Sequence, residues 1–452
     1  MADTIINGLA RFAHSLTYEQ LPENLVEKAK VCILDTYGMG LAGAGLEASA
    51  VAARAARRVA SEGRATVWTT GEKARAIDCV MPNSVASHCF LQDDWDPVSH
   101  AHIGVAVVPT AFAMAQELGR SGREALTATV VGYEIESRSG VVSVPAFTRG
   151  FRASSIYAYF GAAATAAHLM GLDEQAFKNA LGCAGSVTGG VLQPWVDGSM
   201  EWAFQEGFAA RAGILSAILA EEGLRGADHI LEGPRGVNEC VSGSHEDEMR
   251  ALKGLGDDWF MLQTCFKRFA TGGANQGSAA VAWDLHHRHK IDWRRIRHVA
   301  VDIPDTGTHE RMNYAGITYQ GPFHTLDQCL ISKPFAIAAA LKTGRMDIGT
   351  VQDEQANPEI TELAHKIELK EVKGINGWSL DMRVELDDGS VITGTGDNID
   401  QRHLYLNREL AAEKFVGMTE DRIGRKQAER IVEQVFDIEK LETLEPLLEL
   451  AR

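Results

Sequence analysis

Apolar residues recur at helical spacing along the first half of the chain. Between residues 21 and 34 they return to one face every three or four positions, and Pro22 stands where a first helical turn tolerates proline. Residues 156–170 and 209–219 are apolar on nearly every side, which is typical of helices inside a bundle. Further helices are expected at residues 48–59, 109–118, 123–138 and 207–222.

After Phe266 the pattern becomes a mixture of helices and strands. Residues 297–304 alternate between apolar and polar and end at a proline, which predicts a strand. Residues 381–394 form two alternating arms around Asp388-Gly389, which predicts a hairpin. Helical patterns lie at residues 276–288, 334–343, 358–366 and, in a charged amphipathic tail, 408–450.

These patterns predict a mainly α protein of two parts. We expect a large all-helical domain at residues 1–264 and a smaller α+β domain at residues 265–400. Residues 401–452 are expected to pack back on the helical domain, which would make the α+β unit an insertion. The alternative, a separate cap formed by the tail, is left open by periodicity alone.

Composition excludes several classes of protein. The 452 residues include 44 Lys and Arg against 61 Asp and Glu, a net charge of −17, so we expect no nucleic-acid partner. The seven cysteines occur singly without a CxxC pair, which indicates reduced thiols. The N-terminal residues lack the features of a signal peptide, so a cytoplasmic location is expected.

Two segments resemble known motifs, but we do not interpret them as a membrane span or a dinucleotide site. Residues 153–172 carry no Asp, Glu, Lys or Arg, but Ala, Gly and Ser keep their hydropathy low, so we expect a buried helix and no membrane span. Residues 38–43 match GxGxxG, a dinucleotide motif that requires a preceding strand. The preceding residues are helical in period, so we interpret these glycines as sites of close helix packing.

The densest polar cluster runs from Asp93 to Gly104 and has three interpretations. His100 and His102 with an Asp could bind a divalent metal, because alternate residues of an extended segment point the same way. One histidine could instead be a general acid or base oriented by a carboxylate. The third interpretation is a solvated loop whose Asp caps a helix.

A second candidate segment, residues 265–273, lies where the helical pattern ends. Lys267 is flanked by aromatic residues, so it could be a base of lowered pKa or a clamp for a substrate carboxylate. A domain boundary is a favoured place for a cleft. The alternative is a hinge with ordinary surface charge.

Together these segments resemble the MmgE/PrpD family over nearly the whole chain. The order and spacing of the motifs, more than any single one, carry the resemblance. The matching segments are residues 31–43, 83–94, 102–109, 132–138, 160–172, 197–210 and 267–269.

The resemblance implies a fold and a type of chemistry. It implies a large helical domain, a smaller α+β domain similar to chorismate mutase, a homodimer, and an active-site cleft between the domains. It also implies a reaction without metal or organic cofactor on a small polycarboxylic acid. A proton next to a carboxylate would be abstracted or delivered, with loss of water, loss of CO₂ or inversion.

The resemblance implies roles for some individual residues of this chain. His102 and Lys267 hold the positions of a family histidine and lysine, which implies catalytic roles. Asp93 and Asp94 keep the second half of an acidic family motif, whose first Asp is Leu91 here, and we expect both to bind substrate.

Three basic family positions are changed in this chain. Arg152 and Gln276 replace histidines, and Trp202 replaces a lysine. We expect all three to contact the substrate, with Arg152 gripping a carboxylate and a flat or apolar portion lying against Trp202. The alternative is that Trp202 turns into the helical core. Second acids that we consider are Tyr133, Tyr157 and Tyr319, of which Tyr319 is assigned to substrate binding.

Three hypotheses of function follow. The first is a cofactor-free lyase or isomerase that acts next to a carboxylate of a small di- or tricarboxylic acid by dehydration, decarboxylation or epimerisation. The second is a carboxylate-binding protein on the same fold that has lost catalysis. The third is a metal-dependent hydrolase or lyase that uses Asp93, His100 and His102.

Overall fold

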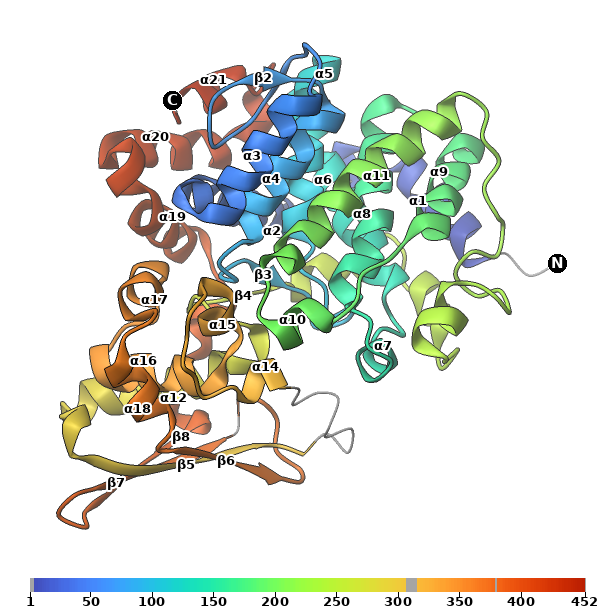
Figure 1. Ribbon diagram of the computed structural model, residues 1–452. Coiled ribbons are helices and arrows are strands. Elements are labelled where there is room, and N and C mark those ends of the chain that lie inside the picture. The colour runs from blue at the N-terminus through green and yellow to red at the C-terminus, as the bar shows by residue number, and fades with distance from the viewer. Residues whose placement is uncertain (1–3, 306–314, 379, 452) are drawn as a thin grey trace.

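Helices dominate the chain up to residue 264, and a small mixed sheet appears only after that point. The structure is a computed structural model that describes residues 4–305, 315–378 and 380–451. Figure 1 shows a large helical domain and, below it, a smaller unit in which helices cover one face of a sheet. The prediction of a mainly α protein with a smaller α+β domain is confirmed.

The helices of the large domain overlap the predicted segments, mostly with wider limits. They are α1 (Ile5–Ser15), α2 (Glu23–Ala42), α3 (Glu47–Val59), α4 (Ala76–His88), α5 (Gly104–Leu118), α6 (Gly122–Ser139), α7 (Val144–Thr148), α8 (Ala153–Met170), α9 (Glu174–Val187), α10 (Gln193–Asp197) and α11 (Gln205–Glu221). Local signals fix several of these limits. For example, Ser121 and Glu124 form a capping box at the start of α6, and Gly119 ends α5 with a φ of +66°.

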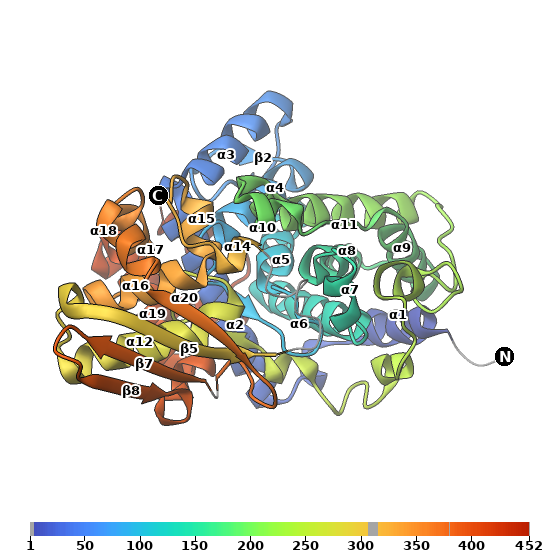
Figure 2. The same ribbon diagram turned by 60° about the horizontal axis from the view of Figure 1, so that its bottom comes forward.

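Helix α8 lies in the centre of the bundle, packed against α5, α6, α9 and α11 (Figures 1 and 2). Its small residues allow this, because a Cβ on Gly161 would come within 2.3 Å of Glu136 Oε2 on α6. This confirms the expected buried helix. Across the described residues, no helix combines the length and apolar character needed to cross a membrane.

The GxGxxG segment lies at the end of α2 and serves helix packing, as expected. A Cβ on Gly40 would lie 2.5 Å from the ring of Trp68, and one on Gly43 would lie 2.1 Å from the carbonyl oxygen of Ala86. Such distances are shorter than real Cβ contacts. Glycine is therefore required at both positions by close approach of neighbouring segments.

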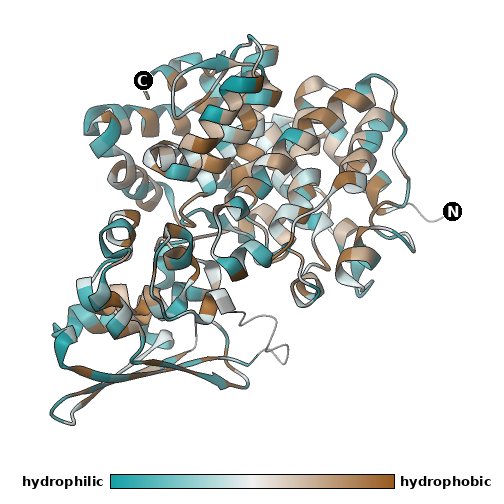
Figure 3. Ribbon diagram, viewed as in Figure 1, coloured by the Kyte–Doolittle hydropathy of each residue, from teal (hydrophilic) through white to brown (hydrophobic). Residues whose placement is uncertain are grey.

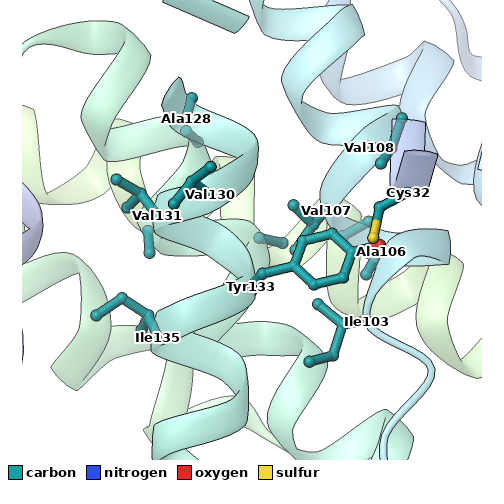
Figure 4. Packing of buried hydrophobic residues seen from close by; sticks show 14 of the residues in the cluster. Cys32, Ile103, Ala106, Val107, Val108, Ala128, Val130, Val131, Tyr133 and Ile135 are labelled. Atoms are coloured by element: carbon teal, nitrogen blue, oxygen red, sulfur yellow. The ribbon is translucent and has the colours of Figure 1, made fainter. Parts of the chain in front are cut away.

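The core between α2, α5 and α6 is apolar and closely packed. Figure 4 shows the ring of Tyr133 on α6 lying between Val107 of α5 and Cys32 of α2. In Figure 3, hydrophobic residues concentrate inside the helical domain, whereas the outer side of α20 (Arg425–Phe436) is hydrophilic. Two side chains of α6 also contact the loop that follows α4, because Tyr133 donates to Asp94 and Ser137 donates to Asp96.

The α+β unit is built on a four-stranded sheet in the order β6-β5-β7-β8. Strand β5 (Ile296–Pro304) and the hairpin of β7 (Asp381–Leu386) and β8 (Val391–Thr395) confirm the predicted strand and hairpin. Strand β6 (Ile367–Val372), parallel to β5, was not predicted, because its charged sequence lacks clear alternation. The helices of this unit are α12 (Gln276–His289), α14 (Ala315–Thr318), α15 (Leu326–Ile331), α16 (Lys333–Thr343), α17 (Ile348–Glu354) and α18 (Pro358–Ala364).

The C-terminal helices pack on the helical domain. Helix α19 (Arg408–Ile423) and α20 contact α2, and α21 (Glu445–Glu449) contacts α20 (Figure 1). An ion pair of 3.0 Å joins Lys30 of α2 to Glu439. We therefore propose that the α+β unit, with boundaries at residues 265 and 400, is inserted into the helical domain.

Candidate active site

Two very short strands bring the polar loop and the lysine segment together. Strand β3 (Asp94–Trp95) pairs antiparallel with β4 (Cys265–Phe266), with Asp94 opposite Phe266. The loop after α4 and the segment before the α+β unit thus become neighbours. This pairing places Lys267 beside Asp93, although 174 residues separate them in sequence.

Asp93 is the centre of a buried charge cluster. Its Oδ1 accepts a hydrogen bond of 2.9 Å from Lys267 Nζ. Its Oδ2 lies 3.0 Å from His88 Nδ1 and 3.2 Å from His102 Nδ1. Burial disfavours its charge, but Lys267 and the two imidazoles outweigh burial and hold the pKa of Asp93 well below its usual range. Asp93 is therefore an anion that orients three basic side chains.

The hydrogen bonds of His102 fix its tautomer. Nδ1 lies 2.8 Å from the carbonyl oxygen of Asp94, which can only accept, so Nδ1 carries the proton. The backbone N–H of His102 donates to Ser154 Oγ at 3.0 Å. Nε2 is then unprotonated, and it makes no hydrogen bond within the described residues. His102 is thus held as a base that presents one free nitrogen.

The charge states of His102 and Lys267 suit opposite roles. Burial, together with the charge of Lys267, lowers the pKa of His102 to about 4, so its imidazole is neutral at physiological pH. Burial also lowers the pKa of Lys267, although Asp93 partly offsets the effect. Nζ of Lys267 lies 3.2 Å from His102 Nδ1. A neutral base and an ammonium group therefore stand side by side.

Asp94 turns away from this cluster toward the helical core. Its carboxylate accepts hydrogen bonds from the backbone N–H of Gly104 at 3.1 Å and from the hydroxyl of Tyr133 at 2.5 Å. Burial raises the pKa of Asp94 to about 7, against the effect of the Tyr133 hydrogen bond. Asp94 was expected to bind substrate. The structure instead places its side chain at the start of α5, where it anchors the loop.

Arg152 is engaged by other protein groups. Its Nη1 donates to the carbonyl oxygen of Trp202 at 2.7 Å and to Glu206 Oε2 at 3.0 Å. Its Nη2 donates to His88 Nε2 at 2.6 Å, and since arginine cannot accept, His88 carries its proton on Nδ1 and donates it to Asp93. A continuous buried network thus runs from Glu206 to Asp93, and Glu206 balances the charge of Arg152.

Trp202 lies behind Arg152 and is fully buried. Its Nε1 donates to Asp327 Oδ1 at 2.7 Å, and its ring meets the ring of His88 edge to face at 5.1 Å. Trp202 was expected to lie against the substrate, but in this position its indole is buried away from the cavity. The alternative, in which the side chain turns into the core, describes the observed placement, because an indole of this size gains more from full burial with a hydrogen-bond partner.

Gln276 and Tyr319 have structural partners. The Gln276 amide accepts from the backbone N–H of Phe269 at 3.1 Å and donates to the carbonyl oxygens of Phe269 and Thr271. It lines the cavity described below, but its polar atoms hold the segment after Lys267 in place. The Tyr319 hydroxyl donates to the carbonyl oxygen of Pro322 at 2.6 Å, and Tyr319 is not part of that lining within the described residues.

The three residues of the metal hypothesis do not converge. His100 directs Nδ1 to Ser143 Oγ at 3.2 Å and its ring toward Trp95, whereas Asp93 is occupied by Lys267. Over residues 4–305, 315–378 and 380–451, no three His, Cys, Asp or Glu side chains are grouped so that they could hold a metal ion. The prediction of a site made of Asp93, His100 and His102 is therefore wrong in its geometry.

A cavity of about 400 Å³ opens onto the His102–Lys267 pair. It lies between the helical domain and the α+β unit, which is where the resemblance placed the cleft. Its polar lining includes His100, His102, Arg152, Ser154 and Lys267. Its apolar lining includes Trp95, Phe147, Trp195, Ile317, Ile331 and Leu404. The cavity can therefore bind a small acid with a partly apolar body.

Sequence reasoning missed several residues of the network. His88 was noticed only as part of a motif, and Glu206 was not singled out. A weak signal for Glu206 was a carboxylate in the first turn of a mostly apolar helix, where burial requires a cationic partner. Trp195 also went unnoticed, although its ring lies 5.2 Å from the guanidinium of Arg152.

Comparison with known proteins gives a consistent result. The family model described as MmgE/PrpD N-terminal domain matches residues 7–250, and the one described as MmgE/PrpD C-terminal domain matches residues 269–438. A cis-aconitate decarboxylase of Aspergillus terreus is 23% identical over 99% of this chain and 95% of its own length. Cis-aconitate decarboxylases of Homo sapiens and Mus musculus are each 25% identical, over 98% and 100% of this chain and 93% of their own.

Proposed function

The chain belongs to the MmgE/PrpD family and is a lyase of small carboxylic acids, and we propose that His102 and Lys267 catalyse proton transfer at the carbon next to a substrate carboxylate. The observation that carries this proposal is the neutral, oriented His102 with a free Nε2 beside a buried ammonium group. Decarboxylation is the first reaction to test, because the relatives named above are decarboxylases.

His102 acts as the proton carrier in this mechanism. Nε2 takes a proton from the carbon, or returns one to it after a bond to that carbon breaks. The imidazolium formed is stabilised by Asp93, whose Oδ2 lies 3.2 Å from Nδ1, and by the Asp94 carbonyl oxygen. Ser154 holds the backbone of His102 and so keeps the ring in position.

Lys267 stabilises the charge that develops on the substrate. Deprotonation or decarboxylation next to a carboxylate places negative charge on its oxygens, and a fixed cation in a buried site lowers the energy of that state. Asp93 aligns the ammonium group at 2.9 Å. Arg152 lines the same cavity, where its remaining donors can orient a carboxylate while Glu206 holds the guanidinium in place.

Solvent-proton exchange tests this function. We expect NMR in deuterated water to show enzyme-dependent deuterium incorporation next to a carboxylate in at least one member of a panel of mono-, di- and tricarboxylic acids. Decarboxylation, dehydration and inversion each give a distinct product spectrum in the same experiment. Binding of an acid with no exchange and no product across the panel would contradict catalysis and favour the carboxylate-binding alternative.

The pH dependence of kcat/KM follows from the two charge states. His102 must be deprotonated, so activity should fall as the pH drops through about 4, well below the range of an exposed histidine. Lys267 must be protonated, so activity should also fall at alkaline pH, below the ordinary lysine value of 10.5. Circular dichroism at each pH separates these effects from unfolding. An acidic limb near pH 6.5 would contradict the assignment of His102 as the base.

The homodimer that the resemblance implies and the cytoplasmic location expected from the N-terminal residues remain predictions. The absence of a metal or organic cofactor from the reaction is likewise a prediction.

A further inference from the structure

The cations that line the cavity are already paired with buried carboxylates. Lys267 is paired with Asp93 at 2.9 Å and Arg152 with Glu206 at 3.0 Å, all four being buried. His102 is neutral at physiological pH. Each carboxylate that enters therefore adds a negative charge to a site whose own charges cancel, and burying more than one is unfavourable without further cations.

The rest of the described lining supplies no further cation for a second carboxylate. Its remaining titratable side chains are His100 and Cys265, and burial lowers the pKa of His100, which keeps its ring neutral. Trp202, at the position where the resemblance implies a lysine, lies behind Arg152 and is buried. The described part of the cavity thus provides for one carboxylate near Lys267 and Arg152.

The cavity also offers a surface for an apolar group, formed by aromatic rings. Trp95, His100 and Phe147 form a chain of edge-to-face contacts, with ring centroids 5.8 and 6.1 Å apart, and all three line the cavity. Trp195 adds another ring next to Arg152. Rings arranged in this way favour a planar apolar group through area burial and edge-to-face contact.

We propose that the substrate carries one carboxylate, held at Lys267 and Arg152, and a planar apolar group that lies against Trp95, His100 and Phe147. This inference rests on the proposed function of the same cavity and specifies its substrate class. Because decarboxylation would remove the one carboxylate that Lys267 and Arg152 hold, a substrate of this class favours inversion or loss of water next to that carboxylate over loss of CO₂. An acid with three carboxylates is then a poor ligand, because two of its charges would lack partners in the described lining.

Isothermal titration calorimetry of the full chain tests this class. The probes are 3-phenylpropionate, which has one carboxylate and a ring, butanoate, which lacks the ring, and tricarballylate, which has three carboxylates. We expect 3-phenylpropionate to bind at least about tenfold more tightly than either of the others, the gain expected for one well-packed ring. Tighter binding of tricarballylate, or no binding of 3-phenylpropionate, would overturn the proposal.

Two variants separate the contributions of ring and charge. Phe147→Ala should weaken 3-phenylpropionate binding about tenfold and leave tricarballylate unchanged, whereas the matched control Phe208→Ala, on the exposed face of α11, should change neither. Glu206→Gln leaves Arg152 with an unbalanced charge and should strengthen tricarballylate binding at least about tenfold. Equal affinities in wild type and Phe147→Ala would overturn the assignment of the aromatic surface.

The proposed substrate class and the proposed function are tested by different measurements, so one can be rejected without the other. The order of affinities reports the substrate class whether or not turnover occurs. Deuterium incorporation across the acid panel reports proton transfer whatever the order of affinities. If a tricarboxylate incorporates deuterium and also binds more tightly than 3-phenylpropionate, the proposed proton transfer is retained and the proposed substrate class is rejected.

Discussion

Replacing His102 by glutamine is expected to lower kcat by about 10²- to 10⁴-fold, the range of a general acid–base contribution. Glutamine keeps a polar side chain of similar length but cannot accept and return the proton. Single-turnover NMR with an identified substrate would measure the loss. Deuterium exchange should fall in parallel, because both observations depend on the same transfer.

A matched control for this variant is His168→Gln. His168 also directs Nδ1 to a backbone carbonyl oxygen, at 3.1 Å from Ala13, and burial lowers its pKa, but it lies in α8 outside the cavity lining. We expect His168→Gln to keep turnover close to that of the wild type. If the two variants lose activity equally, or if folded His102→Gln retains full turnover, then His102 is not the proton carrier.

Replacing Lys267 by methionine is expected to lower kcat by about 10²- to 10³-fold, comparable to the removal of one group that stabilises an oxyanion. Methionine keeps the apolar stem and removes the charge, so the developing enediolate loses its nearest cation. The alkaline limb of the pH profile should disappear as well, since Lys267 is the group assigned to it. Steady-state kinetics across pH would record both effects.

Lys30→Met provides the corresponding control. Lys30 is also buried and ion-paired, with Glu27 and Glu439, but lies in α2 away from the cavity lining. Its loss should affect stability and leave kcat near the wild-type value. Lys267→Arg is informative too, because the planar guanidinium keeps the charge but cannot reproduce the position of the ammonium group between Asp93 and His102. Wild-type kcat in Lys267→Met would reject the role of this lysine.

The altered positions are compatible with the proposed mechanism. Arg152 cannot act as a proton carrier near neutral pH, but Glu206 and His88 fix it where it lines the cavity. In the proposed mechanism, His102 is then the residue that transfers the proton. The proposed site therefore combines His102 and Lys267 with an arginine whose charge Glu206 balances.

The sequence by itself determined the architecture. Helical periodicity located the bundle, and alternation around Asp388-Gly389 located the β7–β8 hairpin. The glycines at 38–43 indicated close packing, which Gly40 and Gly43 show against Trp68 and Ala86. These features are local. Burial on one face of a helix or strand gives a periodic pattern of apolar residues, and a turn requires particular residues at its own positions.

Only the tertiary structure decided how the site is assembled and what its residues contact. The β3–β4 pairing joins Asp93 to Lys267, and no pattern in either segment encodes that long-range register. Trp202 and Asp94 were predicted to bind substrate, but their side chains hydrogen-bond to Asp327 and Tyr133. The direction of a side chain depends on which neighbours satisfy its polar atoms and fill its volume, and those neighbours come from segments that only folding brings together.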